Sequence, residues 1–206
     1  MKFCKGVYQI YMNIPPDLVS QIRSGKCIVF VGHQLSEFAG LPSWKEMLFQ
    51  MWDWSEKYSG PLSDRKELEN LIPEGMVTAV SLTQKLLYPK RLFNKCMTEV
   101  YKSYYDLKPT DIHKLIARLP FASAFTTNYD TLLESAYSHI QGTSPPCYTY
   151  QDTSNVLESI SKNQFCVLKL RGTIDQIDTI IFGQEKSANS LIDYSEFLQY
   201  ILTKQV

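Results

Sequence analysis

The chain has 206 residues, of which 44% are hydrophobic and 20% charged, with 21 basic and 21 acidic residues. This length suits one domain with a sizeable core, and the zero net charge gives no reason to expect binding to nucleic acid. No apolar run approaches the ~18 residues of a membrane span, and the N-terminus lacks the long apolar stretch of a secretory signal. We therefore expect a soluble, cytoplasmic domain that does not bind membranes.

The cysteines and histidines form no recognisable metal or disulfide pattern. The five cysteines are odd in number and widely spaced, without any Cys-x-x-Cys pair, and the three histidines are dispersed. This spacing favours reduced cysteines in the cytosol, and we expect no metal centre. The residues are Cys4, Cys27, Cys96, Cys147, Cys166, His33, His113 and His139.

The first elements in chain order are a short helix and a buried strand. Segment 15–25 opens with two prolines and closes with Ser-Gly, which predicts a helix between them. The continuous apolar run 27–31 lies between two glycines and is typical of a strand that is covered on both faces. We expect a loop over 32–43 and then an aromatic-rich helix over 44–58.

The middle of the chain is predicted to be helical. Four segments show the apolar spacing of amphipathic helices: 63–71, 74–87, 90–105 and 109–119. Pro120 ends the last of them. We interpret about 59–108 as a helical insertion in a single domain that spans residues 1–206.

The stretch FASAFTTNYDTLLE, at 121–134, is the expected centre of the fold. An apolar strand over 121–125 leads through a polar turn, 126–130, into a helix that carries Leu132. Such a turn lies at the carboxyl edge of a parallel sheet, where N–H groups can hold an anionic ligand. Asn128 in this turn is open to two interpretations, a helix N-cap or a ligand-binding residue. Taken alone, its residue type favours the cap.

The last third of the chain alternates between strand and helix signals. A short strand is predicted over 147–150, a helix through 156–160 and a buried strand over 165–170. Another apolar run follows at 179–182, and a last amphipathic piece begins at Tyr194. The order of these elements predicts an α/β fold, a three-layer Rossmann-like arrangement with a mostly parallel sheet and a helical insertion.

Three segments resemble one protein family, in matching order and spacing from about Lys26 to about Phe182. CIVFVGHQLSEFAGLPSW resembles the opening of SIR2-like domains, and KPTDIHKLIARLPFASAFTTNYDTLLESAY is similar to their central strand and Thr-Thr-Asn-Tyr-Asp turn. FCVLKLRGTIDQIDTIIF resembles the strand that ends in Lys-Leu-His-Gly. The variety resembled is the SIR2-like domain of antiviral defence proteins. Deacetylase sirtuins carry a four-cysteine zinc module, and no cysteine pair here has that spacing.

The resemblance implies a SIR2/DHS-type fold that binds NAD⁺ or an ADP-ribose-type nucleotide. Active members of the family break the bond between nicotinamide and ribose. The family asparagine that holds the ribose and helps to place water corresponds to Asn128, beside Thr127. Asp130 is expected to support the ribose or the turn, and the loop from Gly32 to Ser36 is expected to cradle phosphate through its N–H groups.

Two positions depart from the family pattern. Arg171 stands where the family has its histidine base, and Gly172 follows it at the expected ligand site. A guanidinium has no acceptor lone pair and cannot take a proton, although it could bind phosphate or pair with Asp130. In the phosphate loop, the family's Gly-Ala-Gly-x-Ser is replaced here by Gly-His-Gln-Leu-Ser. The side chains of His33 and Gln34 are therefore expected to obstruct or reshape the approach to the pyrophosphate.

These departures lead to two hypotheses. The first is a degenerate domain, a pseudoenzyme that keeps the fold and nucleotide binding and acts as a regulatory or scaffolding partner in a homo-oligomer or with another protein. The second is a working NAD⁺ hydrolase with a rearranged base, for which His33 is a candidate; His113 is expected to be packed. The sequence favours the first, because general-base help is worth roughly 10²–10⁴-fold in rate. The family continues beyond the position of Val206, so we expect that the sequence is a truncated form, that a partner chain completes the nucleotide pocket, or that the pocket is incomplete. A protein deacylase is disfavoured without the zinc module.

Overall fold

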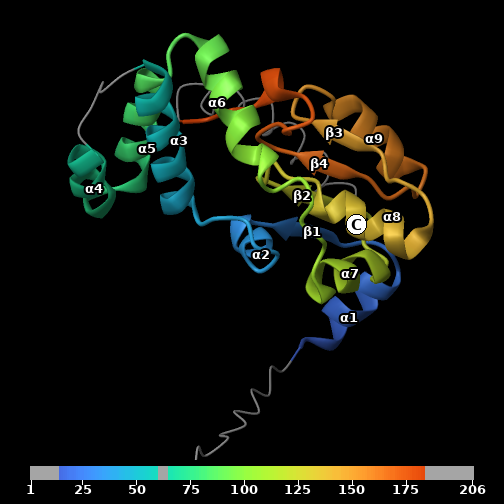
Figure 1. Ribbon diagram of the computed structural model, residues 1–206. Coiled ribbons are helices and arrows are strands. Elements are labelled where there is room, and N and C mark those ends of the chain that lie inside the picture. The colour runs from blue at the N-terminus through green and yellow to red at the C-terminus, as the bar shows by residue number, and fades with distance from the viewer. Residues whose placement is uncertain (1–13, 60–64, 184–206) are drawn as a thin grey trace, which may run out of the picture.

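The computed structural model describes residues 14–59 and 65–183, and its centre is a four-stranded parallel sheet (Figure 1). The strands follow the order β1-β2-β4-β3. Their bounds are Ile28–Val31 (β1), Ser123–Thr126 (β2), Cys147–Thr149 (β3) and Val167–Lys169 (β4). Val31, Thr126 and Lys169 are aligned across β1, β2 and β4, so these strands end at the same edge of the sheet.

Helices cover both faces of the sheet and complete three layers. Ala124 and Val167 face α7 (Asp111–Arg118) and α8 (Leu132–Gln141), in a cluster that includes Ile116 and Leu133. The next residue of each strand, Phe125 or Leu168, points to the other face and packs with Val156 of α9 (Thr153–Ser161). This alternation confirms the predicted α/β, Rossmann-like fold with a parallel sheet.

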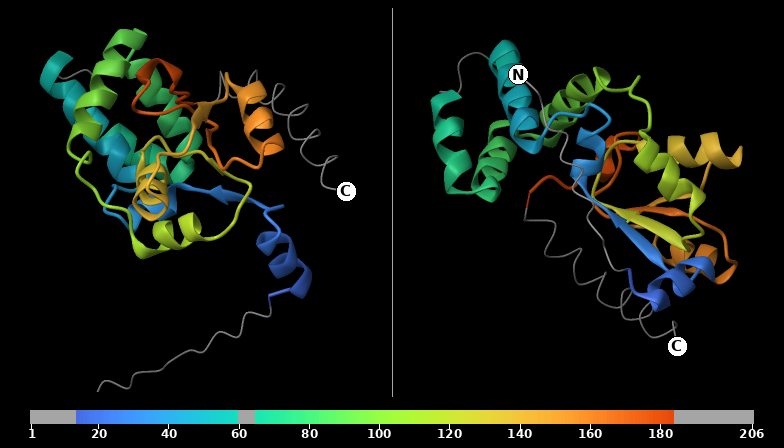
Figure 2. Two further views of the ribbon diagram at one scale, coloured as in Figure 1. Left: turned by 90° about the vertical axis from the view of Figure 1, so that its right-hand side faces the viewer. Right: turned by 90° about the horizontal axis from the view of Figure 1, so that it is seen from below.

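A block of four helices stands beside the sheet, as the view from below in Figure 2 shows. Its members are α3 (Trp44–Ser59), α4 (Arg65–Glu74), α5 (Met76–Leu86) and α6 (Lys90–Lys102). Buried Met51, Trp52 and Met97 belong to its core, and this cluster continues into Tyr129 and Phe182 near the sheet. This block begins at Trp44, and the helical insertion at about 59–108 stays a prediction.

Several predicted boundaries differ from the structure. The predicted loop over 32–43 contains a short helix, α2 (His33–Glu37). The buried strand predicted over 165–170 pairs only over Val167–Lys169. The apolar run 179–182 joins no strand of the sheet in the described part of the chain, because it follows a 3₁₀ turn, Ile177–Thr179, and folds back so that the Ile181 N–H bonds the carbonyl of Arg171. The amphipathic piece predicted from Tyr194 lies outside the described residues.

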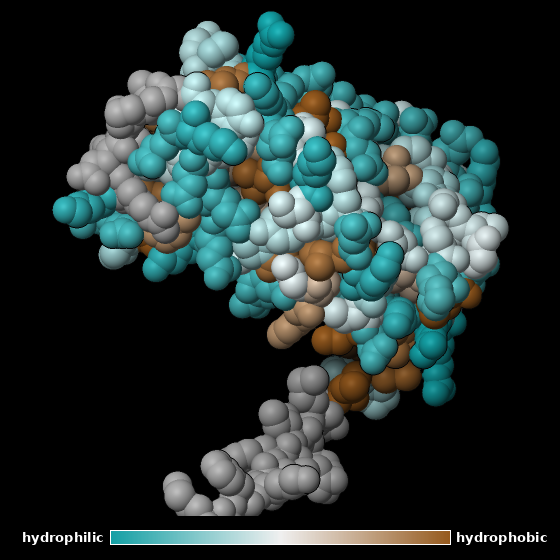
Figure 3. Space-filling view, viewed as in Figure 1, coloured by the Kyte–Doolittle hydropathy of each residue, from teal (hydrophilic) through white to brown (hydrophobic). Residues whose placement is uncertain are grey.

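The surface carries an apolar area over α1 (Pro16–Arg23) and α7, low on the face shown in Figure 3. Leu18, Ile112 and Leu115 are exposed there. Within the described ranges, every helix is too short or too polar to cross a lipid bilayer.

Candidate functional site

The candidate site lies where β1, β2 and β4 end. Gly32 directly follows β1, the turn to Asp130 starts at Thr126, the last residue of β2, and Arg171 lies two residues beyond the end of β4. Because the three strands are parallel, the topology brings these segments to one edge, as the sequence predicted. We call Gly32, Ser36, Asn128 and Asp130 the β1–β2 end, and Lys169, Arg171 and Gly172 the β4 end.

Asn128 is held by the segment that follows β1. It is only 5% exposed, and its Nδ2 donates to the carbonyl of Gly32 (3.1 Å) and to Oγ of Ser36 (2.8 Å). Helix α8 begins further on, at Leu132, whose N–H bonds Oδ1 of Asp130 (3.0 Å). The helix-cap interpretation of Asn128 is therefore wrong, because Asp130 serves the first turn of α8 instead.

A chain of hydrogen bonds orients the carboxamide of Asn128. Ser36 accepts from Asn128 and donates its own proton to Oδ2 of Asp130 (2.7 Å). Since Nδ2 has two acceptors, the amide orientation is fixed, and its Oδ1 is buried without a hydrogen-bond partner in the described part of the chain. A buried acceptor without a partner is costly, and such a group is where a ligand hydroxyl would gain most.

Gly32 leaves open space at the same end. A Cβ placed on Gly32 would meet no atom within 4 Å, and its φ of −103° is available to any residue. Its lack of a side chain is thus required neither by backbone conformation nor by local packing. Open space beside Asn128 would allow a ligand to approach the protein backbone closely.

His33 points towards the helical block. Its Nε2 lies 2.8 Å from the carbonyl of Pro42, and its ring centre lies 5.2 Å from that of Trp44. The contact with a carbonyl requires a proton on Nε2, so this nitrogen donates and does not accept. The nearest carboxylate, Glu37, is 3.8 Å from the same atom.

His113 has the packed role expected for it. It is buried in α7, where its Nδ1 accepts from the N–H of Thr110 (3.2 Å) in a capping box. Burial lowers the pKa of His113 from its usual 6.5, and nearby Asp130 opposes the change.

A buried ion pair at the β4 end was not predicted from the sequence. Lys169 is 1% exposed, and its Nζ lies 2.8 Å from Oε1 of Glu134 on α8 and donates to the backbone carbonyl of Asp130. Burial alone would lower the pKa of Lys169, but Glu134 and Asp130 outweigh it and raise the pKa. The thiol of Cys147 donates to the same Glu134 oxygen (3.2 Å), and its pKa is raised to about 12, first by burial and then by Glu134. The signal that could have revealed the pair is a lysine within an apolar strand, which demands a counter-charge.

Gly172 is fixed by the chain itself. Its φ is +84°, and a Cβ there would lie 2.3 Å from the carbonyl oxygen of Thr179. Only glycine satisfies both conditions, so backbone packing explains this residue without a ligand.

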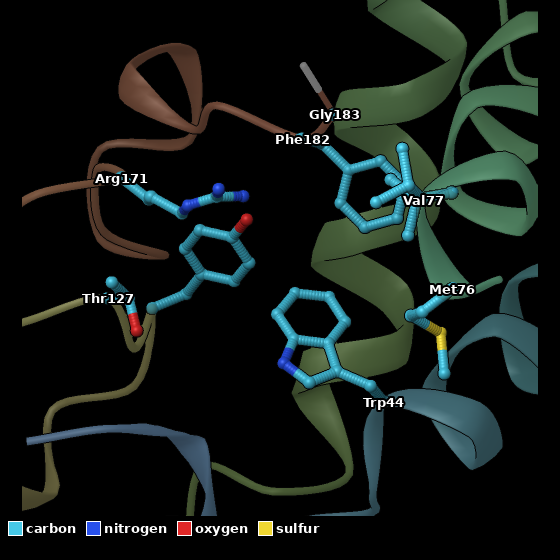
Figure 4. Close-up of a pocket in the computed structure, with 9 residues that line it drawn as sticks. Trp44, Met76, Val77, Thr127, Arg171, Phe182 and Gly183 are labelled. Atoms are coloured by element: carbon cyan, nitrogen blue, oxygen red, sulfur yellow. The ribbon is translucent and has the colours of Figure 1, made fainter. Parts of the chain in front are cut away.

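Arg171 faces a cavity of about 380 Å³ between the sheet and the helical block (Figure 4). Thr127 lies on the same wall, and Trp44 and Phe182 lie opposite. Of the two roles that the sequence left open for Arg171, the pairing with Asp130 is not among the contacts of the described residues; the carboxylate oxygens of Asp130 accept from Ser36 and Leu132. Asn128 turns to the β1 side instead, so the two residues occupy neighbouring parts of one edge.

Comparison with known proteins shows which family the residues at this edge of the sheet resemble. The sequence model of the SIR2-like domain matches residues 122–205, a range that contains the turn of Asn128 and the strand end of Arg171. Residues 122–205 are thus similar to a SIR2-like domain. The chain is also 27% identical, over 186 residues, to the NAD(+) hydrolase ThsA of Acinetobacter baumannii (strain 532279), which covers 88% of this chain. The chain spans about a third (34%) of the length of that relative.

The polar residues at this edge do not form a metal-binding cluster within the ranges that the structure describes. No group of three or more His, Cys, Asp or Glu side chains there is placed to bind an ion. The arrangement at the β1–β2 end instead offers a fixed amide, a free buried acceptor and open space, which fit the ribose and phosphate parts of a nucleotide.

Proposed function

We propose that this SIR2-like domain binds an NAD-type nucleotide at the β1–β2 end and cleaves it poorly or not at all. The observation that carries the proposal is the presence of Arg171 where the family has its proton acceptor, next to an intact Asn128 network. Binding and proton transfer thus depend on different residues, and only the second has been lost.

Binding is supported by the geometry around Asn128. Its free Oδ1 can accept from a ribose hydroxyl, while Ser36 and Asp130 keep the carboxamide in place. The open space at Gly32 gives room for phosphate. NAD⁺ itself would supply the reactive bond between nicotinamide and ribose; the chain supplies the contacts that orient the ribose.

Poor cleavage is supported by the state of the possible proton acceptors. Arg171 cannot accept a proton. Nε2 of His33 donates a hydrogen bond to the carbonyl of Pro42. Nδ1 of His113 already accepts a hydrogen bond from the N–H of Thr110. Asp130 accepts hydrogen bonds on both oxygens.

Calorimetry and a cleavage assay test the two parts separately. We expect ADP-ribose to bind the full chain. Asn128→Ala should bind it at least about tenfold more weakly, because the variant loses one or two buried hydrogen bonds. Asn155→Ala, an exposed asparagine on α9, is the matched control. Nicotinamide release from NAD⁺ should stay at the level without protein, and unchanged ADP-ribose binding by Asn128→Ala would contradict the site.

An active NAD⁺ hydrolase is the second candidate. It is favoured by the similarity to the NAD(+) hydrolase ThsA and by the intact turn after β2. Nicotinamide release that is lost in Asn128→Ala would establish it and refute the degenerate reading. Activity gained in Arg171→His alone would show instead that only the base is missing.

We also propose a cytoplasmic regulatory role in an antiviral defence assembly, as a homo-oligomer or with a partner protein. The support is the resemblance to defence-associated SIR2-like proteins. Light scattering of the purified chain at several concentrations tests for the homo-oligomer. If the chain is a monomer at every concentration, only a complex with a partner protein remains.

A further inference from the structure

The cavity in front of Arg171 has two chemically different walls (Figure 4). Thr127 and Arg171 come from the strand ends, whereas Met76, Val77 and Trp44 come from the helical block. The volume of about 380 Å³ is near the lower end of ligand pockets, which run roughly 300–1,000 Å³. It therefore suits a small molecule.

The first wall presents a positive charge. The half-buried guanidinium of Arg171 lies beside the phenol of Tyr129, which donates its proton to the carbonyl of Ile181 (2.8 Å). Burial raises the pKa of Tyr129 well above its usual value, although Arg171 lowers it in part, so the phenol stays neutral. Arginine has five N–H donors, and a neutral phenol does not neutralise its charge.

The opposite wall is apolar and partly bare. Met76 is 36% exposed and Val77 51% exposed, although both line the cavity. The rings of half-buried Trp44 and buried Phe182 lie 6.1 Å apart. A cation that faces bare apolar and aromatic side chains across a small cavity favours a ligand with an anionic end and an apolar body.

We infer that this cavity binds a small organic monoanion, an aromatic carboxylate whose carboxylate pairs with Arg171 and whose ring packs against Trp44 and Phe182. A carboxylate matches the fork of a guanidinium in a bidentate pair. A phosphate dianion would bring a second negative charge that a single arginine leaves uncompensated in apolar surroundings. Thr127 adds a hydroxyl to the same wall.

This site is separate from the β1–β2 end. Thr127 and Tyr129 flank Asn128 in the chain, but none of the lining residues accepts a hydrogen bond from its side chain, and Ser36, Asn128 and Asp130 do not line the cavity. Carboxylate binding can therefore fail while nucleotide binding succeeds, and the reverse also holds.

Benzoate and benzamide form the test pair, since they have the same ring and differ in charge. Their binding to the full chain is measured by saturation-transfer NMR titration. We expect benzoate to bind at least about tenfold more tightly than benzamide, as a charge-assisted pair predicts. Arg171→Gln should remove this preference, and Arg91→Gln, an exposed arginine of α6, should keep it.

A second pair of variants tests the opposite wall without touching Arg171. Val77→Asp adds a negative charge at an exposed position, and Val77→Asn has nearly the same shape without the charge. We expect the aspartate variant to bind benzoate several-fold more weakly than the asparagine variant. Equal binding of benzoate and benzamide, a preference that survives in Arg171→Gln, or equal benzoate binding by the two Val77 variants would overturn the inference.

Discussion

The β1–β2 end and the β4 end share one edge of the sheet but are built from different interactions. At the β1–β2 end, Asn128 and Ser36 are joined by side-chain hydrogen bonds, and Gly32 borders open space. At the β4 end, Lys169 is locked in a buried ion pair and Gly172 is pressed against the backbone of Thr179. The first end keeps open space and a buried acceptor without a partner, whereas Lys169 and Gly172 at the second are explained by the packing of the chain itself.

This difference teaches that two motifs at one site need not have the same kind of role. In the Lys-Leu-Arg-Gly strand end, Lys169 and Gly172 are explained by packing, and only Arg171 faces a cavity. In the turn after β2, Asn128 keeps an unused acceptor that packing does not explain. Changes at Lys169 or Gly172 should therefore lower stability, and changes at the β1–β2 end should lower binding.

The largest effect is expected for Gly172→Ala. Backbone strain at φ of +84° and overpacking against Thr179 together should cost about 3–6 kcal/mol of unfolding free energy. Urea unfolding followed by circular dichroism measures it. Gly142→Ala at the end of α8 has a similar positive φ but open space around it, so it should cost only the strain. Equal losses in the two variants would show that the contact with Thr179 does not matter.

Removal of one partner of the buried ion pair comes next. Glu134→Ala leaves Lys169 charged and buried, and such a change typically costs about 3–5 kcal/mol. The control is Glu158→Ala, because Glu158 pairs with Lys162 on the surface and its loss should change the unfolding midpoint little. A small effect of Glu134→Ala would mean that the β4 end does not depend on the pair.

Sequence reasoning located the edge better than its internal contacts. The strand-turn-helix pattern at 121–134 and the apolar run before Arg171 were enough to place both ends on a parallel sheet, because strand periodicity is local. The pairing of Glu134 with Lys169 joins residues far apart in sequence, which no local pattern reveals. The cap assignment failed for the same reason, since Ser36 engages Asn128 from a distant segment and Asp130 takes over the helix start.

Gly32→Ala should affect binding and not stability. Its φ and the empty space around it allow a methyl group, so the unfolding midpoint should move by less than about 2 °C. ADP-ribose should bind about tenfold more weakly if a phosphate approaches this backbone, a loss of ~1.4 kcal/mol. Calorimetry measures the affinity. Unchanged affinity would place the phosphate elsewhere and weaken the distinction between the two ends.

The smallest expected effect is the pH dependence of stability that comes from His113 of α7. Because burial lowers the pKa of His113 below its usual 6.5, the unfolded chain takes up a proton there that the folded chain resists. Stability is thus unaffected by His113 above pH 6.5 and falls as the pH drops below this value. His113→Asn keeps an acceptor for Thr110 but cannot be protonated, so its melting temperature should fall less between about pH 7.5 and pH 5.5 than that of the natural chain. Only this slope is diagnostic, because loss of the ring lowers stability at every pH. Parallel slopes in the two proteins would show that His113 does not control the acid response.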